Sequence, residues 1–190
     1  MRVFDSGMPD ESYWNTLFDV KKIVDWLDVK SIADPIVEIG CGYGTFTVPV
    51  AQAAGGEIYS FDIDPVMIGR ADSHVQKSSL PNVRFFLCDV LEHGTGLTTS
   101  SCGMVLLFNI LHFEQRRQML EEASRILKPG GIAAIVHWRK DIVTPRGPAI
   151  ETRPDEEIIL RAIEGLGLEP FGKSEILEPY HWGLKLGKKL

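Results

Sequence analysis

Glycine occupies alternate positions in the stretch Gly40-Cys41-Gly42-Tyr43-Gly44, and this spacing could bind an anionic group. A short apolar run precedes the stretch and a helical pattern follows it. Glycine is needed where the backbone takes a positive φ or must lie close against a ligand. The free N–H groups and the positive dipole end of a helix start favour an anionic ligand group. The stretch therefore predicts a strand, a tight turn and a helix N-terminus that bind a ligand together.

Polar side chains end the three predicted strands that follow. Asp62 ends the second strand, Asp89 follows the third and Asn109 follows the fourth. Asp62 comes 22 residues after Gly40 (62 − 40), close to the roughly 20 expected of an acid that binds a ribose. A carboxylate there can accept two hydrogen bonds from a vicinal diol. Together these residues predict a cofactor that contains adenosine.

Two other nucleotide-binding motifs fit the glycine stretch less well. A nicotinamide dinucleotide favours the spacing G-x-G-x-x-G, whereas the glycines here follow the spacing G-x-G-x-G. A nicotinamide-dependent oxidoreductase is therefore a weaker alternative. No G-K-S or G-K-T sequence directly follows the glycines, which excludes a P-loop there.

Five strands that alternate with helices would position these residues. The predicted strands are 35–39, 57–61, 83–87, 104–108 and 132–138. The predicted helices are 45–53, 65–76, one that opens within 109–113 and reaches Leu127, and one that Asp155 caps and that runs to about Gly165. Segments 168–177 and 179–186 predict an antiparallel strand pair. The fold class is therefore α/β, a doubly wound, mainly parallel seven-stranded sheet with an antiparallel C-terminal strand pair. Ligands on such sheets lie beyond the carboxyl ends of the strands.

The N-terminal segment, residues 1–30, is predicted to form a helical lid. Asp10 or Ser12 can cap a helix that runs to about Val29. Because this helix precedes the first strand, it could lie across the ligand edge of the sheet. Tyr13 and Trp14, in its first turn, are the residues best placed to face a ligand. With 190 residues the chain is long enough to bury a core, and we expect a single domain over residues 1–190.

Composition and charge narrow the range of partners. The formal net charge of −6 argues against nucleic acid, which favours a basic face. No apolar run approaches the roughly 20 residues of a membrane span, and no apolar signal core begins the chain, so we expect a cytoplasmic location. The scattered cysteines Cys41, Cys88 and Cys102 form no C-x-x-C pair, and we expect neither a metal site nor a disulfide framework.

Five segments of the chain resemble motifs of the class I S-adenosylmethionine (SAM)-dependent methyltransferases. In the family's order, these segments are Val37–Gly44, Asp62–Asp64, Cys88–Val90, Asn109–His112 and Leu127–Gly131. The resemblance is close over residues 33–138, and the two closing strands are consistent with it. It implies a Rossmann-like methyltransferase fold, SAM as the cofactor and methyl transfer as the activity.

The resemblance also implies roles for residues around the methionine part of SAM. Gly40, Cys41 and Gly42 would offer backbone groups to it, and Glu38 would lie near its ammonium. Asn109 would lie beside the sulfonium and the methyl group that is transferred. A sulfonium needs polar but non-nucleophilic surroundings, which an amide supplies.

A second set of roles concerns the adenosine part. Asp62 would hold the ribose hydroxyls, and Ile63 would pack against the adenine. Asp89 would accept a hydrogen bond from the adenine amino group, and Val90 would offer its backbone nearby.

The methyl acceptor is harder to predict. A general base is needed only if the acceptor loses a proton, and His112 is the first candidate because it follows Asn109 by about one helical turn. His137 and His181 are alternatives. No Asn-Pro-Pro-Tyr sequence follows the fourth strand, which argues against methylation of DNA amino groups, and a chain of 190 residues favours a small-molecule acceptor. A module that binds SAM without turnover, or that serves a partner protein, is the alternative from another class. The oligomeric state stays open.

Overall fold

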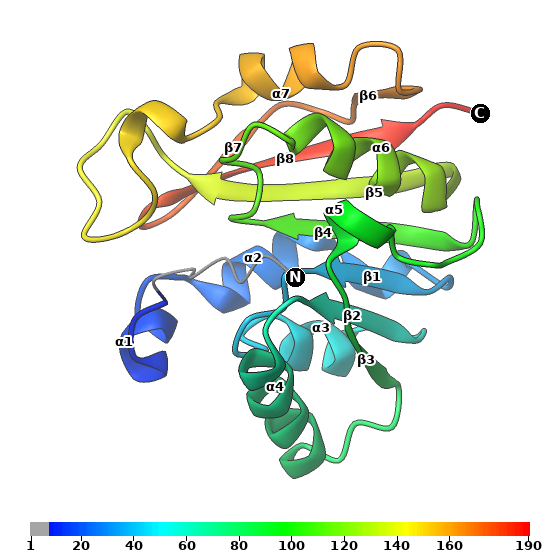
Figure 1. The fold of residues 1–190 in the computed structure, drawn as a ribbon, viewed down its shortest axis with the longest axis vertical. Coiled ribbons are helices and arrows are strands. Elements are labelled where there is room, and N and C mark those ends of the chain that lie inside the picture. Colours follow the sequence, from blue (N-terminus) through cyan, green and yellow to red (C-terminus); the bar gives the residue numbers. More distant parts are fainter. Residues whose placement is uncertain (1–7) are drawn as a thin grey trace.

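An eight-stranded mixed sheet forms the centre of the computed structural model, which describes residues 8–190 (Figure 1). In spatial order the strands are β3 (Val83–Leu87), β2 (Ile58–Asp62), β1 (Ile36–Ile39), β4 (Cys102–Phe108), β5 (Leu127–Trp138), β8 (His181–Lys188) and β6 (Leu168–Pro170), with β7 (Glu175–Leu177) also paired to β8. The first five strands are parallel, and β8 is antiparallel to β5, β6 and β7. This topology confirms the predicted α/β fold with antiparallel strands at its C-terminal end.

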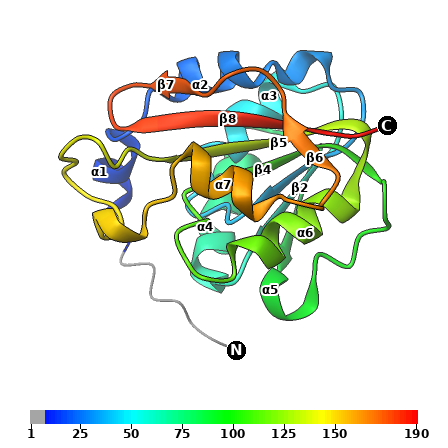
Figure 2. The same cartoon turned by 90° about the horizontal axis from the view of Figure 1, so that it is seen from above.

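Helices cover both faces of the sheet (Figure 2). α2 (Val20–Leu27) and α3 (Thr47–Ala53) pack on one face, and α6 (Arg116–Ile126) and α7 (Glu156–Ala162) pack on the other. The remaining helices are α1 (Glu11–Asn15), α4 (Pro65–Lys77), α5 (Val90–His93) and two 3-10 helices, η1 (Val29–Ser31) and η2 (Ile150–Thr152). None of the helices that residues 8–190 form is both long enough and apolar enough to cross a membrane.

The central strands separate two hydrophobic clusters. Every residue of β1 and β4 is buried, as expected of strands that are covered on both faces. Successive side chains on a strand point to opposite faces, so Ile36 and Met104 pack with α2 and α3 whereas Val37 and Val105 pack with α6 and α7. The carboxyl edge of the sheet is thereby held between two packed layers.

The predicted N-terminal helix is two helices, α1 and α2, separated by residues 16–19. The side chain of Asp10 accepts a hydrogen bond from the N–H two residues further on (2.9 Å), which confirms it as a cap. Asp19 accepts one from the N–H three residues further on (3.0 Å) and begins the second helix. The turn between them buries Phe18. Residues 1–7 of the predicted lid segment lie outside the described residues.

The prediction of seven strands was one too few. The segment predicted as one strand, 168–177, forms β6 and β7, and both pair with the same edge of β8. Gly172 lies between them with a φ of +88°, a left-handed conformation that takes the chain out of the sheet. β5 begins at Leu127 instead of 132, because a register shift in its ladder with β4 lets the strand include residues 128–131.

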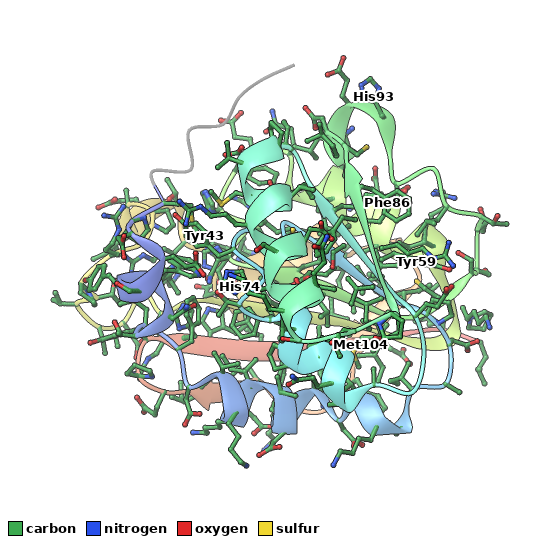
Figure 3. All side chains as sticks on the ribbon, turned by 90° about the horizontal axis from the view of Figure 1, so that it is seen from below. Tyr43, Tyr59, His74, Phe86, His93 and Met104 are labelled. Carbon is green, nitrogen blue, oxygen red and sulfur yellow. The ribbon has the colours of Figure 1, made fainter. Side chains whose placement is uncertain are left out.

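Residues 8–15 are tied to the glycine stretch and to α4. The hydroxyl of Tyr43 donates to the carbonyl oxygen of Pro9 (2.8 Å). Glu11 contacts Arg70 (3.2 Å) and His74 (2.9 Å) on α4. Figure 3 shows Tyr43 and His74 on the side of α4 that faces α1. These contacts hold the segment against the carboxyl edge of the sheet.

Candidate functional site

A cavity of about 570 Å³ lies at the carboxyl ends of the parallel strands, the edge at which ligands bind in doubly wound sheets. Its size falls within the roughly 300–1,000 Å³ of small-molecule sites. All but one of the residues predicted to bind the cofactor line it, together with the first candidate base, and these are Gly40, Cys41, Gly42, Asp62, Ile63, Asp89, Val90, Asn109 and His112. The exception is Glu38, and the alternative bases His137 and His181 do not line the cavity either.

The glycine stretch forms the predicted tight turn. Gly40, Gly42 and Gly44 have φ values of +83°, +53° and +80°. A Cβ at Gly40 would lie 2.8 Å from Cγ2 of Ile110, and one at Gly44 would lie 3.1 Å from Cα of Ala71. Only glycine therefore meets both the conformation and the space at these two positions.

The N–H groups of this turn are bonded to β2. Those of Gly40 and Cys41 donate to the carbonyl oxygen of Phe61 (2.7 and 3.1 Å), and that of Gly42 donates to Oδ2 of Asp62 (2.8 Å). α3 begins at Thr47, two residues later than predicted. The N–H groups of Gly40, Cys41 and Gly42 are therefore not free for an anionic ligand, contrary to the expectation for this turn. The contacts of the turn with a cofactor stay a prediction.

Asp62 is placed to bind a diol. Its Oδ1 accepts from the N–H of Asp64 (3.0 Å) and its Oδ2 from that of Gly42 (2.8 Å). A carboxylate has about four acceptor positions, two on each oxygen, so one on each oxygen remains for a ligand. Burial raises the pKa of Asp62, and the two backbone hydrogen bonds oppose this rise. The two bonds also fix the orientation of the carboxylate at the cavity wall.

Asp89 has a structural task besides its predicted one. Its Oδ1 caps α5 by accepting from the N–H groups of Leu91 (3.1 Å) and Glu92 (3.3 Å). Both bonds use Oδ1, so Oδ2 is the atom that remains for a ligand. Ile63 and Val90 line the cavity close to the two acids in sequence.

Glu38 lies beneath the glycine turn and not on the cavity wall. Its side chain is buried, and its Oε2 accepts from the hydroxyls of Thr47 (2.5 Å) and Ser60 (2.9 Å). Burial raises the pKa of its carboxyl to about 7, although both hydroxyls act in the opposite direction. The structure does not bring Glu38 to the cavity with the other residues, and its predicted place near the cofactor's ammonium stays a prediction.

Asn109 is held in an uncommon conformation at the end of β4. Its φ is +57°, which non-glycine residues rarely adopt and which recurs at functional sites. Its N–H donates to the carbonyl oxygen of Val136 (2.8 Å), and its Nδ2 lies 3.4 Å from Nε2 of His181. Oδ1 of Asn109 is buried and has no hydrogen-bond partner within residues 8–190.

Three histidines gather behind this asparagine. His112 lines the cavity, with its ring centroid 5.8 Å from that of His137, and His181 stacks on Phe18 at 4.4 Å. Burial lowers the pKa of all three, to about 3 for His137 and His181, so their rings are neutral at pH 7. Among the described residues, the unpaired buried side-chain atoms all belong to these histidines and Asn109. The structure thus keeps a polar cluster open to partners at the end of β4.

Four aromatic rings form a further part of the cavity wall, which we call the aromatic limb. It consists of Trp14, Phe46, Phe108 and Trp138. Trp14 lies 6.3 Å from Trp138 and Phe46 lies 4.9 Å from Phe108, measured between ring centroids. Sequence patterns pointed to Trp14 but missed the two phenylalanines. Their positions, two residues after the glycine turn and directly before Asn109, could have indicated them.

No group of three or more histidine, cysteine or acidic side chains within residues 8–190 is arranged to hold a metal ion. A family of proteins described as a methyltransferase domain matches residues 36–131, which is half of the chain.

The chain belongs to this family.

Membership confirms the resemblance to the class I SAM-dependent methyltransferases, and with it the enzyme class and the cofactor.

Relatives of this methyltransferase extend the comparison. The 23S rRNA (uracil(1939)-C(5))-methyltransferase RlmD of Shewanella sediminis is 37% identical over 71 residues, which cover 37% of this chain and 16% of that protein. The match thus spans about a sixth of the relative's length. Because this relative's name specifies rRNA, the predicted exclusion of nucleic acid stays a prediction.

Solved structures show the same fold. A SAM-dependent methyltransferase from Aquifex aeolicus has a TM-score of 0.80 at 24% identity, over 94% of each chain. Magnesium protoporphyrin IX methyltransferase from Synechocystis PCC 6803, with bound S-adenosylhomocysteine (SAH), has a TM-score of 0.70 at 18% identity, over 90% of this chain and 81% of that one. These likenesses show the Rossmann-like methyltransferase fold that the sequence predicts.

Proposed function

We propose that this methyltransferase binds SAM at the carboxyl edge of its sheet and transfers the methyl group to a small molecule in the same cavity. The observation that carries the proposal is the single cavity that joins the glycine turn, the strand-end acids and Asn109 to the aromatic limb. The first three suit the cofactor, and the limb is left for an acceptor. We further propose that the described residues act as one domain and that residues 8–15 form a lip over the cavity.

The residues present fit the cofactor. Asp62 keeps one acceptor position on each oxygen for a ribose diol, and Oδ2 of Asp89 remains for the adenine amino group. Gly40 and Gly42 line the cavity without a side chain, so a ligand can approach the backbone of the turn closely. When bound, SAM supplies an electrophilic methyl group on a positively charged sulfur. The oxygen of Asn109 offers this region a polar group that is not a nucleophile.

Catalysis by this chain would rest on position more than on acid–base chemistry. Orientation of two reactants in a site closed to water supplies much of the rate of a displacement reaction. Where the acceptor carries a proton, the neutral ring of His112 can receive it, because burial keeps the pKa of His112 below its usual value. His112 is thus the residue we propose as a base.

Calorimetry with SAM and SAH tests the proposal. We expect saturable binding of both, and transfer of radioactive methyl from SAM to at least one compound in a panel of small acceptors. Absence of binding of either cofactor form would refute the proposed function. Binding without transfer across the panel would support the alternative, a SAM-binding module, and transfer to RNA alone would refute the small-molecule acceptor.

A further inference from the structure

The aromatic limb adds a further set of residues to the cavity, beside those that suit SAM. Its rings come from α1, from the turn before α3, and from the ends of β4 and β5. Trp138 is buried, whereas Trp14 is partly exposed at the cavity mouth. Flat, rigid rings on several sides favour a flat apolar ligand, because stacked and edge-to-face ring pairs are favourable.

The outer wall of the limb is fixed in place by Arg153. This buried guanidinium donates to the carbonyl oxygens of Arg139 (2.7 Å), Arg146 (3.3 Å) and Pro148 (2.9 Å), and so holds the loop of residues 139–153 together. A Cβ at Gly147 would lie 2.9 Å from the ring of Trp138, so the loop backbone packs directly on the indole. The limb is therefore a preformed surface.

Charge at the limb disfavours a cation. Arg146 lines the cavity there, and the guanidinium of Arg153 lies 5.9 Å from the ring centroid of Trp138. The acids that line the cavity among residues 8–190 are Asp62, Asp64 and Asp89, which follow β2 and β3 at the cofactor end. Among the cavity-lining residues the acidic groups thus lie at the cofactor end and a guanidinium lies at the limb, which favours a neutral or anionic molecule over an ammonium there.

Two buried atoms beside the limb have no hydrogen-bond partner within residues 8–190. Oδ1 of Asn109 is one, and its orientation is set by the Nδ2 group that faces His181. Nδ1 of His112 is the other, and it accepts hydrogen bonds when the neutral imidazole carries its proton on Nε2. Unpaired buried acceptors are costly, so a ligand at this point is favoured if it supplies an O–H or N–H group.

We propose that the aromatic limb binds a small aromatic acceptor, neutral or anionic, whose reacting group is a hydroxyl or ring N–H directed at Asn109 and His112. This inference rests on the proposed function. In the reaction, the acceptor's heteroatom donates an electron pair to the methyl carbon while the carbon–sulfur bond breaks toward sulfur. The acceptor's proton passes to Nδ1 of His112 and then to solvent. The products are the methylated aromatic compound and SAH.

A series of compounds with one aromatic ring and different substituents tests the proposed class of acceptor. Binding of phenol, 4-hydroxybenzoate, tyramine and benzoate to SAH-loaded protein is measured by saturation-transfer NMR titration. We expect 4-hydroxybenzoate to bind at least tenfold more tightly than tyramine, about 1.4 kcal/mol, because their charges differ. We expect benzoate, which lacks the hydroxyl, to bind less tightly than 4-hydroxybenzoate. With SAM in place of SAH, phenol and 4-hydroxybenzoate should gain a methyl group.

Two neighbouring residues of α1 provide a matched pair of variants. Trp14 lines the cavity, whereas Tyr13 is 40% exposed and does not. We expect Trp14→Ala to weaken binding of 4-hydroxybenzoate at least fivefold while SAH affinity changes less than twofold, and Trp14→Phe to recover most of the loss. Tyr13→Ala should leave both affinities unchanged.

Several outcomes would overturn the inference. Tyramine could bind as tightly as 4-hydroxybenzoate or more tightly, or benzoate could bind as tightly as 4-hydroxybenzoate. Trp14→Ala could leave the affinity for 4-hydroxybenzoate unchanged, or no aromatic probe could bind to protein that binds SAH. Failure of SAH itself to bind would instead refute the proposed function, so the two failures are distinguishable.

Discussion

Glu38→Gln should change how the stability of the protein depends on pH. The carboxyl is 3% exposed, and burial raises its pKa from 4.5 to about 7. Its Oε2 accepts hydrogen bonds from Thr47 and Ser60, and the amide oxygen of glutamine can accept both. The substitution therefore removes the ionisable group and keeps the two bonds.

The size and sign of the effect follow from the two pKa values. Between pH 4.5 and about 7 the folded protein binds the Glu38 proton and the unfolded chain does not. The contribution of this group to stability is therefore present below pH 4.5, and it falls as the pH rises until the folded carboxyl ionises near pH 7. A difference of about 2.5 pKa units corresponds to about 3 kcal/mol. Glutamine avoids this loss.

Urea denaturation between pH 4.5 and 8.5 measures the pH-dependent contribution of Glu38 to stability. We expect the free energy of unfolding of Glu38→Gln, minus that of the natural chain, to rise by about 3 kcal/mol from the lowest to the highest pH. Any cost of burying the amide N–H groups is independent of pH and shifts the whole difference curve without changing its shape. Glu164→Gln, at an exposed position, is the control and should give a flat difference. A flat difference for Glu38→Gln would refute the reasoning.

Four further predictions concern the site and its surroundings. Asp62→Ala should lower SAH affinity at least tenfold, about 1.4 kcal/mol, by calorimetry, because it removes both acceptor positions for a diol; unchanged affinity would remove Asp62 from the site. Gly44→Ala should destabilise the protein by about 1–3 kcal/mol in urea, because its φ is +80° and its Cβ would crowd Ala71. Stability should fall as the pH drops below 6.5, because His137 and His181 stay neutral in the fold, with pKa values of about 3, while the unfolded chain takes up their protons. His137→Gln should reduce that slope by up to about 1.4 kcal/mol per pH unit, and an unchanged slope would contradict the burial argument. Gly147→Ala should weaken 4-hydroxybenzoate binding more than SAH binding, since its Cβ would displace the loop from Trp138.

Local patterns predicted which polar residues meet at the carboxyl edge of the sheet. The glycine turn follows β1 directly, Asp62 ends β2 and Asp89 lies two residues beyond β3, and parallel strands bring their carboxyl ends to one edge whatever the packing elsewhere. Glu38 shows the limit of such reasoning. It adjoins the turn in sequence, but alternation along β1 directs it to the same face as Ile36, where Thr47 and Ser60 bury it.

Local sequence patterns could not predict the features that depend on contacts between distant segments. The place of His181 behind Asn109 follows from the antiparallel insertion of β8 beside β5, which pairs His181 with Trp138. The break in the N-terminal helix depends on whether Asp19 begins a new helix or lies on the surface of a longer one, and apolar spacing fits both. Gly172 is likewise compatible with a strand until both of its neighbours pair with β8.

The division of the cavity wall along the chain has a consequence for engineering. Gly40, Asp62, Asp89 and Asn109 lie inside the matched segment 36–131, as do Phe46 and Phe108 of the limb, whereas Trp14, Trp138 and the loop 139–153 lie outside it. Exchange of the flanking segments between members of the family should therefore redirect the enzyme to new acceptors and leave its methyl donor unchanged. In the proposed function, the matched segment would bind the same methyl donor throughout the family, and the flanking segments would select the acceptor.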